Sequence, residues 1–306
     1  MFKAFFFTAI LALPVSGALA AGTAAEEPLR CELGKSAQET VQSCTRMLAL
    51  PDLVVTAKRS ALVVRASAYN QMNELGLAAA DFVAAQDIGY TPDVSYVLGG
   101  VYVNVGKSEE AILEYSKIVD AGLASAGVFN ARGAAYQNAG KYEESIADFN
   151  KALFLAPNLL MPLNNRATAF AKQGNYAAAV KDIDAVLAKN PDMPIALVNR
   201  CTFLIRDGNF KLGRQSCDRA EHMAPDDDFV MQGLAFNYYE AGLFKEALSY
   251  FDRSLRLKPN SAWALYGRGK TKEKLGMKEE SEADISAAER IQPDVAVFMS
   301  RGGWKW

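Results

Sequence analysis

The chain has 306 residues, half of them apolar, so it is long enough for one large or two ordinary domains with a buried core. Its 33 basic and 35 acidic side chains nearly cancel and are spread along the sequence. This balance excludes the strong field of one sign that draws a protein to DNA, RNA or an anionic membrane, so nucleic acid is not an expected partner.

The first twenty residues have the composition of a secretory signal peptide. A positive start is followed by an apolar run over residues 4–13 and by a small-x-small cleavage site that ends at Ala20. We therefore predict a leader cleaved after Ala20 and a periplasmic or secreted product that is not stably inserted in a membrane. The alternative is an uncleaved anchor, because apolar and small residues continue to Ala25.

Residues 21–58 follow the leader and carry a degenerate helical pattern, so we expect an opening helical hairpin there. Cys31 and Cys44 straddle the expected turn of this hairpin. Between them, the run from Ser36 to Glu39 is typical of a capping box, which predicts that the second helix begins at this point.

A unit of fixed length recurs in the rest of the chain. Glycines 34 residues apart are Gly140, Gly174, Gly208, Gly242 and Gly276, and the prolines seventeen residues after them are Pro157, Pro191, Pro225, Pro259 and Pro293. Apolar residues between these marks have helical spacing, as at Ile146, Phe149 and Leu153. Each unit is therefore predicted to be two helices, with a tight turn at the glycine and a second break at the proline.

The order of aromatic, small and proline positions in one unit resembles the tetratricopeptide repeat, through Phe129, Gly133, Tyr136, Gly140, Tyr142, Phe149, Ala152 and Pro157. The resemblance implies an all-α fold, a right-handed superhelical solenoid of antiparallel helix pairs. About seven units are expected over residues 59–295, at 59–92, 92–125, 126–159, 160–193, 194–227, 228–261 and 262–295. Residues 296–306, with Trp304 and Trp306, are too few for another pair and are expected to form a closing cap or tail.

Several units carry an arginine that is followed by an aspartate sixteen residues later. These pairs are Arg65 and Asp81, Arg132 and Asp148, Arg166 and Asp182, and Arg268 and Asp284. In an antiparallel hairpin the two positions lie level on facing helices, so we predict structural ion pairs rather than sites for phosphate or carboxylate ligands. Units with Leu98 and Leu234 in place of the arginine also lack the aspartate, and Arg200 is the exception that faces Ser216.

The four cysteines suggest two disulfides in an oxidising compartment, with three possible connectivities. Cys201 lies seven residues before Gly208 and Cys217 nine residues after it, which places the two level on facing helices. We predict the pairs Cys31–Cys44 and Cys201–Cys217. Metal binding is the alternative, but the cysteines lack close spacing and the single histidine, His222, is distant from most of them.

Catalytic chemistry has little support in the sequence. One histidine provides a single candidate base, and no glycine-rich loop follows a strand to cradle a phosphate. The acidic run from Asp226 to Asp228 lies at a break between units, where it suits a helix start. We therefore predict no enzyme activity, no catalytic residue, no metal and no cofactor.

In the resembled family, the first helices of the units line a concave groove, and this implies a partner-binding surface here. The residues carried over are Asn130, Asn164, Asn165, Asn199, Thr202, Phe236, Tyr239, Trp263 and Tyr266. Amides suit an extended peptide backbone and aromatic rings supply rigid apolar area, although the rings could instead pack between units. The lysines that let some family members grip a C-terminal carboxylate are missing.

Three hypotheses of function remain at this stage. The leading one is a non-catalytic scaffold or adaptor in the cell envelope that binds an extended peptide or protein segment in its groove. A second is a module that binds a glycan or a peptidoglycan fragment, since rings and amides also suit sugars. A third is an assembly component that associates with itself through the tryptophan-bearing tail. The identity of the partner and the oligomeric state stay open.

Overall fold

The computed structural model describes residue 31 and residues 36–301, and in this range the chain is helical without strands. The predicted signal leader and the pair Trp304 and Trp306 lie outside the described residues. The helices are α1 (Ala37–Leu48), α2 (Val55–Gln71), α3 (Leu75–Ile88), α4 (Pro92–Asn104), α5 (Ser108–Asp120), α6 (Ala126–Asn138), α7 (Tyr142–Leu155), α8 (Leu160–Lys172), α9 (Tyr176–Lys189), α10 (Pro194–Arg206), α11 (Phe210–Met223), α12 (Asp228–Glu240), α13 (Phe244–Leu257), α14 (Ala262–Lys274), α15 (Lys278–Ile291) and α16 (Val295–Arg301).

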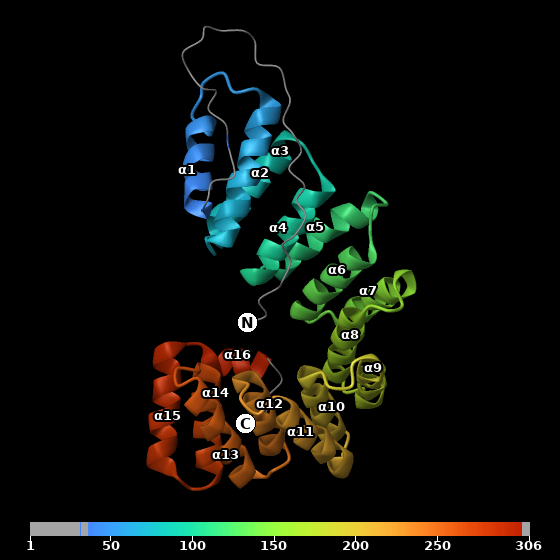
Figure 1. The fold of residues 1–306 in the computed structure, drawn as a ribbon, viewed down its shortest axis with the longest axis vertical. Coiled ribbons are helices and arrows are strands. Elements are labelled where there is room, and N and C mark those ends of the chain that lie inside the picture. The colour runs from blue at the N-terminus through green and yellow to red at the C-terminus, as the bar shows by residue number, and fades with distance from the viewer. Residues whose placement is uncertain (1–30, 32–35, 302–306) are drawn as a thin grey trace.

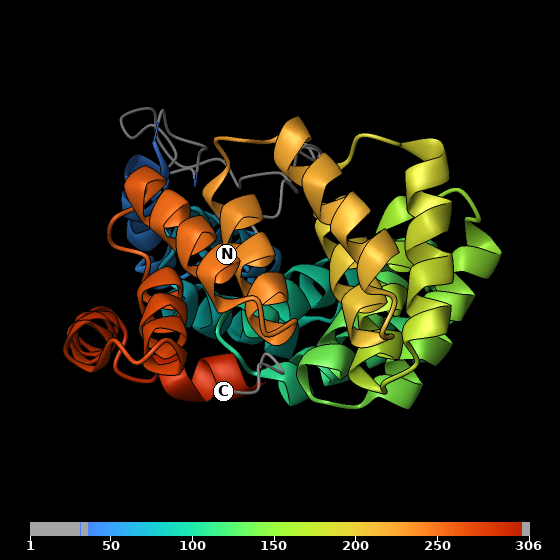
Figure 2. The ribbon, with the colours of Figure 1, turned by 90° about the horizontal axis from the view of Figure 1, so that it is seen from below.

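These helices form a right-handed solenoid of antiparallel pairs, the fold expected from the repeat. Each even-numbered helix from α2 to α14 packs against the odd-numbered helix that follows it and against the one that precedes it. Figures 1 and 2 show the array bending along α6 to α10, so that its two ends lie on the same side of the molecule. The even-numbered helices lie along the inner side of this bend, and α7 and α9 lie outside it (Figure 1).

The turn within each pair follows from the recurring glycine. Gly140 has φ +77°, and the amides of Gly140 and Lys141 donate to the carbonyls of Gln137 and Tyr136, a Schellman end for α6. The pair α2 and α3 has no glycine at this place, and Asn73 adopts φ 62° instead. Asparagine tolerates this left-handed conformation, so the unit at 59–92 keeps its turn although it lacks the glycine.

Small residues in the inner helices let large rings of the outer helices pack closely. A Cβ atom added at Gly133 would lie 2.7 Å from the ring of Phe149, which is fully buried. In an interior packed at crystal-like density, that ring cannot retreat without moving its own neighbours. The glycine in the repeat is therefore required by packing as well as by sequence pattern.

Replacing Gly133 with alanine is therefore expected to lower the free energy of unfolding by about 1–3 kcal/mol, because the added methyl group overpacks the site. Gly100→Ala is the matched control, since Gly100 also lies within a helix but its nearest contact would be the Tyr115 hydroxyl at 3.8 Å. There the higher helix propensity of alanine should leave stability unchanged or raise it by up to ~1 kcal/mol. Urea unfolding followed by circular dichroism measures both, and equal losses would contradict this account.

The two ends of the described array are closed differently from its middle. Within 36–54 the structure has one helix, α1, which packs against α2, and the Ser36 hydroxyl accepts a hydrogen bond from the amide of Glu39 as the capping box predicted. At the other end α16 packs against α14 and buries Val295 and Met299 in the core that extends from α10. A short helix thus covers the last pair.

Candidate binding groove

The arginine and aspartate pairs join the two helices of one unit with two hydrogen bonds each. The Nε atom donates to Oδ2 at 2.6–2.7 Å, and Nη2 donates to Oδ1, in the pairs Arg65–Asp81, Arg132–Asp148, Arg166–Asp182 and Arg268–Asp284. All four aspartates are buried. This geometry is that of a bidentate structural pair and not of a guanidinium aimed at a ligand.

A second set of contacts from the same arginines was missed by sequence reasoning. The Nη1 atom of Arg132 donates to Ser116, and that of Arg166 donates to Asn150, in each case sixteen residues earlier on the outer helix of the preceding unit. Arg268 likewise donates to Asp252 at 2.8 Å. Each of these arginines therefore joins the two helices of its own hairpin and also bonds to the outer helix of the hairpin before it.

In the two units that have a leucine at the arginine position, other polar side chains link the neighbouring helices. At Leu98 the Gln86 amide of α3 donates to both Ser95 and Glu114, which lie on α4 and α5. At Leu234 the link joins α11 and α13, since Tyr250 and Arg253 both donate to the Glu221 carboxylate.

Burial opposes ionisation of Asp284, but hydrogen bonds from Arg268 and Lys272 outweigh it and hold the pKa of that carboxyl below its ordinary value. Arg200, in contrast, donates to Ser216 on its own hairpin and to Asp184 on the preceding one. Its carboxylate partner thus lies sixteen residues before it instead of after it.

Both predicted cysteine pairs are disulfide-bonded in the structure. Cys31 is joined to Cys44 of α1, and Cys201 of α10 to Cys217 of α11, with the Cα atoms of the second pair 5.4 Å apart. Cys201 and Cys217 are buried. The second disulfide therefore links the two helices of the one unit whose arginine has no aspartate on its own hairpin.

The asparagines of the inner helices form a ladder between neighbouring units. Asn165 donates its Nδ2 to Oδ1 of Asn130 at 3.1 Å, and Asn199 donates to Asn164 in the same way at 3.0 Å. Further along, the Thr202 hydroxyl donates to Asn237 at 2.7 Å. The structure thus brings the predicted groove amides together, and each uses part of its hydrogen-bonding capacity within the ladder.

Three of the four predicted groove aromatics are buried in the core instead of projecting from it. Phe236 is 3% exposed and meets Phe251 edge to face, with ring centroids 5.0 Å apart. Tyr239 packs against Phe244, and burial, with Glu273 nearby, raises its pKa to about 12. Tyr266 is buried as well, so these three rings belong to the shared core of the C-terminal units. Trp263 alone of the four is exposed.

Charged side chains lie at the C-terminal ends of the same inner helices. Arg206 at the end of α10 forms a bidentate ion pair with Glu240 at the end of α12, and both side chains are largely covered. Burial, together with the positive charge of Arg206, lowers the pKa of Lys172 at the end of α8.

Within residue 31 and residues 36–301, no group of three or more histidine, cysteine, aspartate or glutamate side chains is placed to hold a metal ion. None of the helices in that range is both long and apolar enough to cross a membrane. His222 is exposed near the end of α11.

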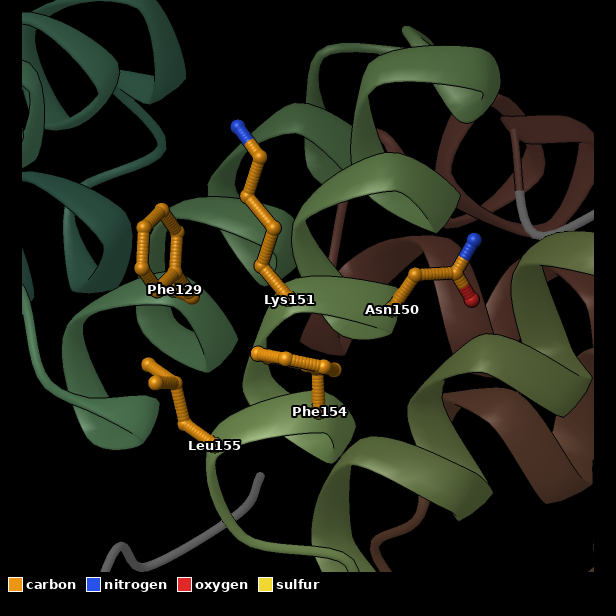
Figure 3. Close-up of a pocket in the computed structure, with 5 residues that line it drawn as sticks. All are labelled: Phe129, Asn150, Lys151, Phe154 and Leu155. Carbon is orange, nitrogen blue, oxygen red and sulfur yellow. The ribbon is translucent and has the colours of Figure 1, made fainter.

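A separate apolar hollow lies where α7 meets the start of α6, away from the inner face. Figure 3 shows Lys151 and Leu155 near the ring of Phe129, with Phe154 and Asn150 beside them on α7. Phe154 is 86% exposed, while the same position in the other units is Asp87, Asp120, Ala188, His222, Arg256 or Arg290. Phe154 therefore has no part in the packing of the repeat.

Comparisons with known proteins agree on the fold. Residues 126–159 match the family model of the tetratricopeptide repeat, and residues 169–266 match that of the N-terminal tetratricopeptide region of Psidin. No curated protein sequence matches the chain.

Among solved structures, a tetratricopeptide repeat protein from Parabacteroides merdae is 20% identical with TM-score 0.69, over 79% of this chain and 96% of its own. Yeast Tom70 is 14% identical with TM-score 0.62, and the APC/C hetero-tetramer Cut9–Hcn1 supplies a chain that is 15% identical with TM-score 0.55. These matches cover 87% and 89% of this chain but only 58% and 55% of the other two. At such identities the likeness shows the fold alone.

Proposed function

Because the chain is built of tetratricopeptide repeats, whose fold is typical of non-catalytic scaffolds for protein–protein interaction, we propose that it binds an extended segment of a protein partner along its inner surface. The amide ladder carries this proposal. The bond between Asn164 and Asn199 uses the Oδ1 atom of the first and the Nδ2 atom of the second, and the other half of each amide is offered to a ligand. The backbone of an extended peptide offers N–H donors and C=O acceptors in turn, and the two halves of an amide can bond to both.

We place this scaffold in the cell envelope, outside the reducing cytoplasm. The signal-like composition of the first twenty residues supports export, and two pairs of cysteines at disulfide distance are compatible with an oxidising compartment. One of these pairs is buried between two helices of the solenoid. A protein that relies on such a bond is suited to a compartment where the bond persists.

Site-specific crosslinking tests the binding surface. A photoreactive amino acid at Thr168, which lies on the inner helix α8 within the ladder, should crosslink a peptide segment of an envelope protein, identified by mass spectrometry. The same group at Phe154, on the hollow away from the inner face, is the control and should give no such product. Equal crosslinking at both positions, or none at Thr168, would reject the groove as the binding site.

A glycan or peptidoglycan fragment is the second candidate, because Trp263 and Phe229 are exposed rings at the start of α14 and α12. Rings of this kind stack on sugars, while the amides of the inner helices α6, α8 and α10 could supply hydrogen bonds. Binding to purified cell-wall material that has been stripped of protein, with loss on Trp263→Ala, would favour this candidate over a peptide. If the chain binds only protein and not the stripped cell-wall material, the glycan candidate is excluded.

A further inference from the structure

All but three of the fourteen residues of α3 are apolar or glycine, yet only part of this helix is covered. It packs against α2 and α4, and two of its polar side chains, Asp81 and Gln86, are bonded within the fold. Another side of α3 is one wall of a hollow, in which the residues of this helix are Gly76, Ala79, Ala80, Val83, Ala84 and Asp87. All six are exposed or partly exposed, and we refer to them as the α3 face.

The repeat fold does not require an apolar surface at this place. A helix that is apolar all round is normally buried, and exposed apolar patches mark interaction sites. Leu77 and Val83, which are 50% and 38% exposed, extend the apolar surface of α3. Counted from the left-handed residue of each turn, the α3 face has Gly76, Val83 and Ala84 where α5 has Glu109, Ser116 and Lys117.

The opposite wall of the hollow carries a positive charge. It consists of Tyr102, near the end of α4, and Lys107, in the turn before α5. In the next unit the lysine of this turn is Lys141, which forms an ion pair with Glu109 at 2.7 Å. The position of that glutamate on α3 is held by Gly76, so Lys107 lies beside the start of α3 without the carboxylate that Lys141 has.

The end of the α3 face carries the opposite charge. Asp87 lies eleven residues after the first member of the face, which is about 16 Å along the helix. Two other charged side chains come near the hollow without lining it, Lys117, which is paired with Glu114, and Glu110 at the start of α5. Within residue 31 and residues 36–301, no ion pair uses Asp87 or Lys107.

We propose that the α3 face is an interface between two copies of the chain, in which the α3 helices pack antiparallel about a two-fold axis. An isologous contact of this kind joins a patch to the same patch on the other copy, so every contact between the copies is formed twice. Antiparallel helices place Lys107 of each copy beside Asp87 of the other. Parallel helices would place lysine beside lysine and aspartate beside aspartate, which is repulsive, so the charges select one orientation.

The middle of the α3 face allows the two helices to approach closely. Ala79, Ala80 and Ala84 present only methyl groups, and packed helices lie about 8–10 Å apart depending on the side chains between them. One pair of helices is a small contact area, so we expect a reversible dimer and not an obligate one. Because α3 is the second helix of its pair, the interface goes beyond the proposed binding function and leaves the inner helices of both copies open.

Charge exchange tests the orientation in the disulfide-intact mature protein. Sedimentation equilibrium should show a reversible dimer of the native chain, and Lys107→Asp alone or Asp87→Lys alone should weaken it at least tenfold. An equal mixture of these two variants should dimerise again, because one copy then carries two aspartates and the other two lysines, which restores both contacts between opposite charges. The double variant with both changes should also dimerise like the native chain.

A carboxylate in the middle of the α3 face tests the packing. Ala80→Glu brings two carboxylates together at the two-fold axis and should weaken the dimer at least tenfold. Leu113→Glu is the matched control, because Leu113 has the same place on α5 and is 63% exposed, and it should leave dimerisation unchanged. Circular dichroism establishes that each variant is folded. In a mixture of ordinary and isotope-labelled native chains, a carbodiimide should join Lys107 of one copy to Asp87 of the other, as identified by mass spectrometry.

Four results would overturn the inference. A native chain that stays monomeric up to its solubility limit would exclude the interface, and either single charge variant dimerising as strongly as the mixture would exclude the antiparallel orientation. A dimer that survives Ala80→Glu but is lost when residues 302–306 are removed would assign self-association to the tryptophan-bearing tail. A monomer whose residues 21–30 crosslink to a photoreactive group at Val83 would assign the α3 face to the chain's own N-terminal segment.

Discussion

Asp148→Asn is expected to lower the free energy of unfolding by about 3–5 kcal/mol, because it leaves the buried guanidinium of Arg132 without its counter-charge. Asp148 is almost fully buried and accepts hydrogen bonds from Arg132 at 2.6 and 3.0 Å. Asparagine preserves the volume of the side chain and one acceptor oxygen. The loss therefore reports the charge and the second hydrogen bond and not a cavity.

Urea unfolding measures the change, and hydrogen exchange locates it, with the fastest opening expected in α6 and α7. Asp184→Asn is the control, because Asp184 also bonds to an arginine, Arg200 at 2.6 Å, but is half exposed to solvent. An exposed pair contributes about 1 kcal/mol or less. If both variants lost the same small free energy of unfolding, the buried arginine–aspartate pairs would not stabilise the hairpins as described.

Reduction of the Cys201–Cys217 disulfide is expected to lower the free energy of unfolding by an amount on the order of 3 kcal/mol. The bond closes a loop with a sequence separation of 16 residues, and opening it releases chain entropy in the unfolded state. The effect should be large for this chain because the hairpin of α10 and α11 has no arginine and aspartate pair to hold it. Gly213 also brings the helices close, since a Cβ atom there would lie 2.8 Å from Ile205.

Thermal unfolding with and without dithiothreitol measures this effect in the native protein. The double variant Cys201→Ala, Cys217→Ala should unfold at the lower temperature with and without dithiothreitol, because it has no disulfide between α10 and α11 to reduce. The variant Cys31→Ala with Cys44→Ala is the matched control, because its bond lies at the first described helix, where opening disturbs fewer neighbours. A native protein that is insensitive to reductant would contradict the expectation.

The fold was predictable because its main determinants are local and repeated. Left-handed glycines such as Gly140 and the helical spacing between them define each hairpin without reference to the rest of the chain. The pairing of Arg132 with Asp148 was accessible for the same reason, since both residues belong to one hairpin. The contact of Arg132 with Ser116 was not, because it depends on how one unit is rotated against the next.

The groove was predicted less well because exposure there depends on the size of residues in the neighbouring unit. Phe236 lies at a position expected to project, yet its ring enters the space above Gly267, where an added Cβ would come within 2.9 Å of it. No such space receives Phe229 or Trp263, which remain at the surface. A repeat pattern assigns a residue to a face of its helix, but the adjacent helix decides whether the side chain is covered.

The two kinds of link between units differ in strength, and this has a mechanical consequence. Around α8 the links between inner and outer helices are charge-assisted, as at Arg166, whereas the inner helices α8 and α10 are joined by a neutral amide bond between Asn164 and Asn199. The inner helices α10 and α12 are joined instead by the Arg206–Glu240 ion pair. Charge-assisted bonds are roughly twice as strong as neutral ones. The hairpins from α6 to α10 should therefore pivot about their arginines while their inner edges separate, whereas the Arg206–Glu240 ion pair should keep the inner edges of α10 and α12 together.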